Sequence, residues 1–154
     1  LNYVVLSLIL GIQLSYLPSA NPFTLLSTLA KIGPETLLIT IPSLLESLSS
    51  VRAFSNLTLH SVISCGEPLT INTAKKVLFS SNHFYNFYGA TEFCTWIFSI
   101  KVTPEILSSS LSHTVPIGSP LPLVDIVIGQ QGELGVSCDH IATTYVYPFF
   151  EKVF

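Results

Sequence analysis

The residue types that could bind a nucleotide gather in one short segment, residues 86–92, which supplies an amide, an aromatic ring, a glycine, a hydroxyl and a carboxylate. The ring of Tyr88 can stack on a base, and Gly89 lets the backbone approach a phosphate because it has no Cβ. The hydroxyl of Thr91 can donate to a phosphate oxygen, and the carboxylate of Glu92 suits Mg²⁺, which prefers oxygen ligands. The same residues also fit a strand that ends in a glycine turn, with Tyr88 packed and Glu92 solvated.

Three short apolar runs alternate with helical patterns and must form the frame that positions this segment. Strands are predicted at residues 36–41, 59–64 and 84–87, and helices at residues 23–32, after Pro42 and after Thr70. Short strands with a helix between each pair are typical of βαβ units in a parallel sheet. Ligands bind at the carboxyl ends of such strands. Residues 66–67 and 89–92 both fall there, which predicts one site.

Local signals mark several element ends. Ser43 and Glu46 have the spacing of a capping box, and Thr70 can cap the helix that follows it. A helix is also predicted to start at residues 103–105, where Thr-Pro-Glu places a proline at the first helical position. Residues 124–128 and 133–136, joined across residues 129–132, predict a β-hairpin.

The most apolar run, residues 1–17, has two interpretations. It is shorter than the roughly 20 residues that a membrane-spanning helix needs, and polar residues interrupt it. No Lys or Arg precedes Lys31, so the positively charged start of a signal peptide is missing. A buried helix over residues 3–10, followed by Gly11 and a strand near residues 12–17, is therefore the preferred prediction. A small membrane-associated protein remains the alternative.

Composition narrows the class of protein. The 154 residues are 49% hydrophobic and only 10% charged, where about 25% charged is usual. So few charges on a free surface favour association, so we expect this chain to be part of a longer one. A net charge of -3 gives no basic surface, which argues against a nucleic-acid partner. Three cysteines, without the spacing of a metal site, fit a reducing compartment such as the cytoplasm.

Residues 86–92 resemble the Asn-x-Tyr-Gly-x-Thr-Glu motif of adenylate-forming enzymes, the superfamily of acyl-CoA synthetases and peptide-synthetase adenylation domains. Residues 64–69 are similar to its Gly-Gly-Glu-x-Leu segment, and residues 115–120 to its Pro-Ile-Gly-x-Pro segment. The resemblance covers about residues 1–136. It implies an α/β fold, in which residues 1–100 form the parallel βαβ sheet of the AMP-binding domain. Residues 101–137 then start a small β-barrel subdomain, and residues 138–154 match nothing and are unassigned.

The resemblance also implies roles for individual residues. Asn86 is expected near the adenine amino group, Tyr88 against the adenine face, Thr91 at the α-phosphate and Glu92 on Mg²⁺. The expected nucleotide-site residues are Gly66, Glu67, Asn86, Tyr88, Gly89 and Thr91, with Thr91 and Glu92 as the catalytic pair. Cys65 stands where the family has a glycine, which leaves close backbone approach at that position in doubt. The residues expected to line the carboxylate-substrate pocket are Val62, Ser64, Phe87, Thr95 and Trp96.

The reaction that the resemblance implies joins a carboxylic or amino acid to AMP from ATP, with Mg²⁺, and passes the acyl group to the thiol of phosphopantetheine or CoA. The closest subgroup is that of the β-alanine-activating enzymes, whose adenylation domain is joined to a carrier domain, so a small amino acid is the expected substrate. The family's phosphate loop, ribose-binding Asp and C-terminal Lys have no counterpart in this sequence. We therefore expect this chain by itself to be inactive. A non-catalytic binding module of the same fold remains an alternative.

Overall fold

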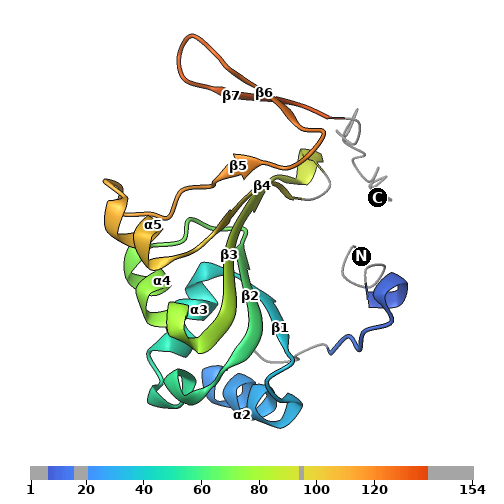
Figure 1. The fold of residues 1–154 in the computed structure, drawn as a ribbon, viewed down its shortest axis with the longest axis vertical. Helices are drawn as coiled ribbons and strands as arrows, with labels where there is room; N and C mark the ends of the chain where they lie inside the picture. The colour runs from blue at the N-terminus through green and yellow to red at the C-terminus, as the bar shows by residue number, and fades with distance from the viewer. Residues whose placement is uncertain (1–6, 16–20, 94–95, 139–154) are drawn as a thin grey trace, which may run out of the picture.

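The computed structural model describes residues 7–15, 21–93 and 96–138, which fold around one mixed five-stranded sheet (Figure 1). Its order follows the chain: β1 (Leu37–Thr40), β2 (Leu59–Cys65), β3 (Ser81–Gly89), β4 (Trp96–Lys101) and β5 (Ser119–Pro120). The first three strands are parallel, as predicted, and β4 and β5 are antiparallel to their neighbours. The predicted α/β fold is confirmed. Strand β4 was not predicted, because no crossover helix was expected between it and β3.

The helices are α2 (Pro22–Ile32), α3 (Pro42–Ser49), α4 (Ile71–Val77) and α5 (Pro104–Ser109), with short 3₁₀ turns η1 (Arg52–Asn56), η2 (Leu78–Ser80) and η3 (Thr91–Phe93). Helix α2 precedes β1, and the other helices come between later strands. In Figure 1, α3, α4 and α5 lie on the same side of the sheet. The core therefore forms between these helices and the strands.

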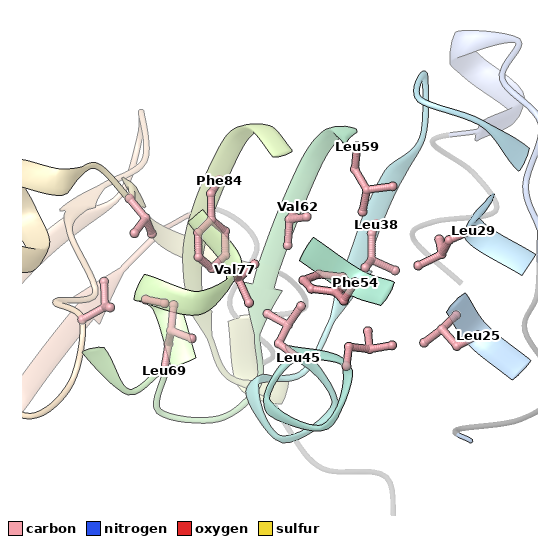
Figure 2. Packing of buried hydrophobic residues seen from close by; sticks show 14 of the residues in the cluster. Leu25, Leu29, Leu38, Leu45, Phe54, Leu59, Val62, Leu69, Val77 and Phe84 are labelled. Carbon is pink, nitrogen blue, oxygen red and sulfur yellow. The ribbon is translucent and has the colours of Figure 1, made fainter. Parts of the chain in front are cut away.

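Alternation along the strands decides which side chains enter that core. Val62 of β2 pairs with Phe84 of β3, and both are buried in one cluster with Leu45 of α3 and Val77 of α4 (Figure 2). Val62 is 0% exposed and Phe84 is 2% exposed. Successive strand residues point to opposite faces. The residues next to these two along the strands therefore face away from the helices.

The helices predicted after Pro42, after Thr70 and at residues 103–105 are all present, as α3, α4 and α5. The hydroxyl of Thr70 accepts from the backbone N–H of Thr73, and that of Thr103 accepts from the backbone N–H of Ile106. The capping box at Ser43 is wrong. The N-cap of α3 is Ile41, whose apolar side chain makes no capping hydrogen bond. Pro42 occupies the first turn, so Ser43 lies inside the helix and its hydroxyl is directed elsewhere.

The N-terminal prediction is only partly met. Residues 7–10 are helical, but residues 12–15 form no strand. Ser7 is buried, but Leu8 and Ile9 are 76% and 75% exposed. The expectation of a buried helix is therefore wrong for the apolar residues 8–10. Residues 1–6 and 16–20 lie outside the described part of the chain. No helix among the described residues is long and apolar enough to cross a membrane.

The predicted hairpin is present, as β6 (Asp125–Ile128) and β7 (Leu134–Ser137), joined by a turn that closes with Gly132 donating to the Gly129 carbonyl. It forms a separate two-stranded sheet that projects from the end of the molecule where β5 lies (Figure 1). The described residues form no closed barrel. Of the unassigned residues 138–154, residues 139–154 lie outside the described part of the chain.

Strand β5 lies very close to β4. Gly118, just before β5, has φ +92°, and a Cβ added there would collide with the backbone carbonyl of Ser99. Only glycine combines that backbone conformation with so close an approach. Gly118 therefore brings the segment of residues 115–120 onto the sheet, next to β3 and β4.

Candidate functional site

The end of β3 is the part of the sheet that carries the predicted nucleotide-binding residues. The pairing of β3 with β4 shifts register between Tyr88 and Gly89, which is a β-bulge. Bulges bend a strand and redirect its side chains. The chain then turns through Ala90 into η3, where Thr91 is exposed and Glu92 is half-buried. A hydroxyl and a carboxylate thus follow directly at the carboxyl end of a parallel strand.

Tyr88 lies immediately before this turn. The residue is 38% exposed, and its ring meets the ring of Phe98 edge-to-face, with 6.0 Å between ring centres. The two residues are direct partners in the β3–β4 ladder. This contact holds one side of the tyrosine and leaves part of the ring in contact with solvent. The geometry is compatible with stacking against a planar base.

Asn86 is buried, with 5% of its surface exposed, and its Nδ2 donates to the backbone carbonyl of Pro116 at 3.0 Å. The bond joins the segment of residues 86–92 to that of residues 115–120. In this structure the Asn86 amide N–H therefore donates to a protein carbonyl. Its expected role near the adenine amino group is not tested and stays a prediction.

The turn after β2 is fixed by a different contact. Gly66 has φ +87°, and the carboxylate of Glu67 accepts from the backbone N–H of Ser43 at 2.9 Å and from the Ser43 hydroxyl at 3.1 Å. A carboxylate at the first turn of a helix is also favoured by the helix dipole. Glu67 thus does for α3 what the predicted capping box was expected to do. It ties the turn to the helix layer.

The same turn is also bonded to the loop that precedes Gly118. The backbone N–H of Val115 donates to the carbonyl of Leu69 at 2.8 Å, and that of Ile71 donates to the carbonyl of His113 at 2.9 Å. Together with the Asn86 bond, these contacts bring the three sequence motifs to one edge of the sheet. The sequence could order these motifs along the chain, but it could not supply these contacts.

The predicted substrate-pocket residues divide between the two faces of the sheet. Phe87 meets Trp96 edge-to-face, with 4.6 Å between ring centres, on the face away from the helices. Val62 and Ser64 are 0% exposed and lie on the helix-covered face, where the Ser64 hydroxyl has no hydrogen-bond partner. Thr95 lies outside the described residues. The structure therefore brings together only part of this set.

Two residues that the sequence analysis did not assign share the face of Phe87. Cys65 is the direct ladder partner of Phe87, and Ile63 is the partner of Tyr85, and both are half-buried. Their place on this face could be found only from strand alternation combined with the β2–β3 register. The sequence shows the alternation but not the register. Without the register, the face that each residue occupies could not be assigned.

A group that could hold a metal was also expected at Glu92. No cluster of three or more His, Cys, Asp or Glu side chains occurs among the described residues. Mg²⁺ is often held by only one or two carboxylates together with substrate phosphates. The half-buried Glu92, next to the exposed Thr91 hydroxyl, fits that pattern.

An open hollow of about 530 Å³ lies elsewhere, between α3 and α4, and it includes none of the predicted site residues.

Comparison with known proteins gives a consistent result. The model of a family described as AMP-binding enzyme matches residues 1–146. The D-alanine–D-alanyl carrier protein ligase of Lactococcus lactis subsp. lactis (strain IL1403) is 42% identical over 85 residues, covering 54% of this chain and 16% of that protein. The ligase of the same name from Staphylococcus aureus (strain Newman) is 28% identical over 131 residues, covering 82% of this chain and 27% of that protein. The chain thus spans from about a sixth to about a quarter of these relatives.

Solved structures share the fold. The crystal structure of IdnL7 superposes with a TM-score of 0.75 at 20% identity, over 86% of this chain and 29% of that one. A four-domain nonribosomal peptide synthetase, holo-AB3403 bound to AMP and glycine, superposes with a TM-score of 0.69 at 23% identity, over 82% of this chain and 10% of that one. At these identities the likeness concerns the fold.

Proposed function

This chain belongs to the AMP-binding enzyme family, and on that premise we propose that it is part of an ATP-dependent ligase that activates a carboxylate as an acyl-adenylate and transfers the acyl group to a thiol. The observation that carries the proposal is the meeting of the three motifs at the carboxyl edge of the parallel strands. Ligands of open α/β sheets bind at that edge. The names of the ligase relatives support the same reaction class.

In the proposed reaction a carboxylate oxygen of the acid attacks the α-phosphorus of ATP, and the bond from that phosphorus to the pyrophosphate oxygen breaks. Tyr88 stacks on the adenine, and Gly89 leaves room for the phosphate next to the backbone. The Thr91 hydroxyl donates to an α-phosphate oxygen, and Glu92 holds Mg²⁺. The metal, when bound, stabilises negative charge on the phosphate oxygens. The acyl carbon is then attacked by a thiol, and AMP leaves.

The turn after β2 supports the nucleotide from the side. The two hydrogen bonds from Ser43 to the Glu67 carboxylate fix the backbone at Gly66. The hydrogen bond from Asn86 to the Pro116 carbonyl fixes the neighbouring strand. Residues held in this way can position a ligand without losing side-chain entropy when it binds. We assign Gly66, Glu67 and Asn86 to this positioning of the nucleotide.

We also propose that residues 1–100 form the AMP-binding part and that residues 101–137 start a second subdomain.

The acid substrate is proposed to be a small amino acid that lies against the open face of the sheet. The perpendicular rings of Phe87 and Trp96 close off space there, and the side chain of Cys65 lies beside Phe87. A long acyl chain would have to displace these packed rings. Val62 and Ser64 face the helix layer, so we do not place them against this acid. Thr95 stays in the proposed lining on the sequence resemblance alone. The relatives named for D-alanine support a small substrate, and β-alanine is the form that the sequence resemblance favours.

The acceptor is proposed to be the phosphopantetheine thiol of a carrier domain. The relatives are named as ligases of D-alanine and a carrier protein. A synthetase of four domains is among the structures with the same fold. CoA offers the same thiol chemistry and is the second acceptor to compare.

The proposal can be tested in a chimera, because the Lactococcus ligase is 42% identical over 85 residues. Residues 1–138 of this chain replace the matching part of that ligase, and exchange of labelled pyrophosphate into ATP is measured with D-alanine, β-alanine, glycine and octanoate. We expect exchange with the small amino acids. At limiting Mg²⁺, Glu92→Gln should slow it about a hundredfold, since removing one charge-stabilising group commonly costs that much.

Two further results decide between the alternatives. Glu105→Gln, at an exposed position in α5, is the matched control and should leave exchange unchanged. A folded chimera that binds ATP but exchanges with none of the acids would support the non-catalytic binding module. A preference for octanoate would contradict the small pocket, and Trp96→Ala should shift preference toward larger acids.

A further inference from the structure

A second group of polar side chains lies at the opposite edge of the sheet, where β2 and β3 begin. His60 and Ser61 stand at the start of β2, and Ser81 and His83 at the start of β3, with Ser61 and His83 as direct ladder partners. The rings of His60 and His83 lie 5.4 Å apart between centres, at an angle of 64°. None of these residues belongs to the nucleotide or acid site proposed above.

Two atoms of this group are buried without a hydrogen-bond partner in the structure. They are Nδ1 of His83 and the hydroxyl oxygen of Ser81. Buried polar atoms are paired in the large majority of cases, and an unpaired one calls for an explanation such as an ion or an ordered water. Both atoms belong to the first three residues of one strand. Their common location points to one shared ligand.

His60 is prepared to bind such a ligand through its second nitrogen. Its Nδ1 lies 2.9 Å from the Ser61 hydroxyl. Histidines that bind metals usually have their other ring nitrogen hydrogen-bonded, which fixes the orientation of the ring. The contact with Ser61 thus leaves Nε2 of His60 for a ligand, while its ring is held near that of His83.

The distance between the rings fits a shared metal ion. Two imidazole nitrogens that each lie about 2.0–2.1 Å from one zinc ion, at a tetrahedral angle, place the ring centres roughly 5 Å apart. The observed separation is 5.4 Å. A pair of rings that merely packs together would not account for the unpaired nitrogen of His83.

We propose that His60 and His83 form a binding site for a divalent transition-metal cation, with zinc as the first choice. Imidazole ligands favour Zn²⁺, Ni²⁺ and Cu²⁺, whereas Mg²⁺ and Ca²⁺ prefer oxygen ligands. The described residues offer no third His, Cys, Asp or Glu at this group, so water completes the coordination and the Ser81 hydroxyl can bond to it. The site joins the starts of β2 and β3 and is separate from the Mg²⁺ proposed at Glu92.

The test is a titration of the metal-free 154-residue chain with ZnCl₂, NiCl₂ and MgCl₂. Calorimetry measures the binding, and the melting temperature measures the change in stability. We expect one equivalent of Zn²⁺ or Ni²⁺ to bind and raise the melting temperature, and Mg²⁺ not to compete. His60→Gln and His83→Gln should each weaken Zn²⁺ binding at least tenfold. Ser61→Ala should weaken it by about tenfold, the lower end of what such supporting residues contribute.

His113→Gln is the matched control, because His113 is exposed on the loop before β5. Equal affinity of His113→Gln and His83→Gln would overturn the proposal, as would equal binding of Mg²⁺. If His83→Gln does not fold, the wild-type chain still decides the question with Co²⁺. A tetrahedral Co²⁺ spectrum that His60→Gln abolishes supports the site, and an octahedral, water-like spectrum overturns it.

Discussion

The two faces of the sheet are built from alternate residues of the same strands, and they differ sharply in packing. On the helix-covered face, Val62 and Phe84 are almost completely buried between β2, β3 and the helices. On the open face, Cys65, Phe87 and Trp96 are only half-buried. Phe87 contacts Trp96 edge-to-face and is the ladder partner of Cys65. The covered face stabilises the fold, and the open face and its edge carry the residues that are proposed to meet ligands.

The difference shows how one strand can both stabilise the core and present residues to a ligand. Asn86 belongs to the covered face and holds the Pro116 segment, whereas its neighbour Phe87 belongs to the open face. A shift of one residue in register would exchange these two sets. The packing of the covered face thus fixes which side chains appear on the other.

The largest effect is expected for Phe84→Ala, which should destabilise the chain by about 3–5 kcal/mol because it leaves a cavity in the core. Phe87→Ala is the matched change on the open face. It should cost about 1 kcal/mol, mainly the edge-to-face contact with Trp96. Urea unfolding followed by circular dichroism measures both. Equal costs would mean that the two faces are packed alike.

Asn86→Ala is expected to destabilise the chain by about 1–3 kcal/mol, because the change removes the buried amide and its part-buried hydrogen bond to the Pro116 carbonyl. The comparison is with Asn82→Ala, at an exposed position of the same strand. That variant should stay within about 0.5 kcal/mol of the wild type. If Asn82→Ala proved the more costly of the two in urea unfolding, the covered face would not depend on this bond.

Glu67→Ala is expected to cost about 1 kcal/mol, through loss of the two bonds from Ser43 at the edge where the faces meet. Ser43→Ala removes only the hydroxyl donor and should cost about half as much. The double variant should cost little more than Glu67→Ala alone, since the two residues share one interaction. Additive costs in the same unfolding assay would show that they act independently.

The smallest effect concerns Glu105, an exposed residue of α5. The Thr103 hydroxyl, followed by the backbone N–H of Glu105, lowers the pKa of this exposed carboxyl below its usual value. A lowered pKa in the folded state adds stability above the unfolded value, and this is lost as the pH falls through the folded value. Glu105→Gln should therefore lower the melting temperature slightly at pH 7, with the difference disappearing in acid. A difference that grows in acid would have the wrong sign.

Features set by neighbouring residues could be predicted from the sequence. Thr70 caps α4 because its hydroxyl needs to reach only three residues ahead, and the three parallel strands follow from their apolar runs. Features set by distant residues could not. Glu67 takes the place of the predicted capping box at Ser43 from 24 residues away, and nothing local to either residue indicates that contact.

The candidate site follows the same division. Residues 86–92 could be assigned to a strand end and its turn, as the structure shows. The faces on which Val62, Ser64 and Phe87 lie could not be assigned, because they depend on the register of β2 against β3. Strand β4 was also missed, and with it the ring of Trp96 placed against Phe87.

The contact between Phe87 and Trp96 has a practical consequence, because the chain contains a single tryptophan. Indole fluorescence is sensitive to the polarity around the ring. In this chain it comes only from Trp96 on the open face, whose ring centre lies 4.6 Å from that of Phe87. An acid that displaces water from this face should shift the emission toward the blue, with no background from elsewhere in the chain. The protein therefore contains its own optical probe, and occupancy of the open face can be followed without a label.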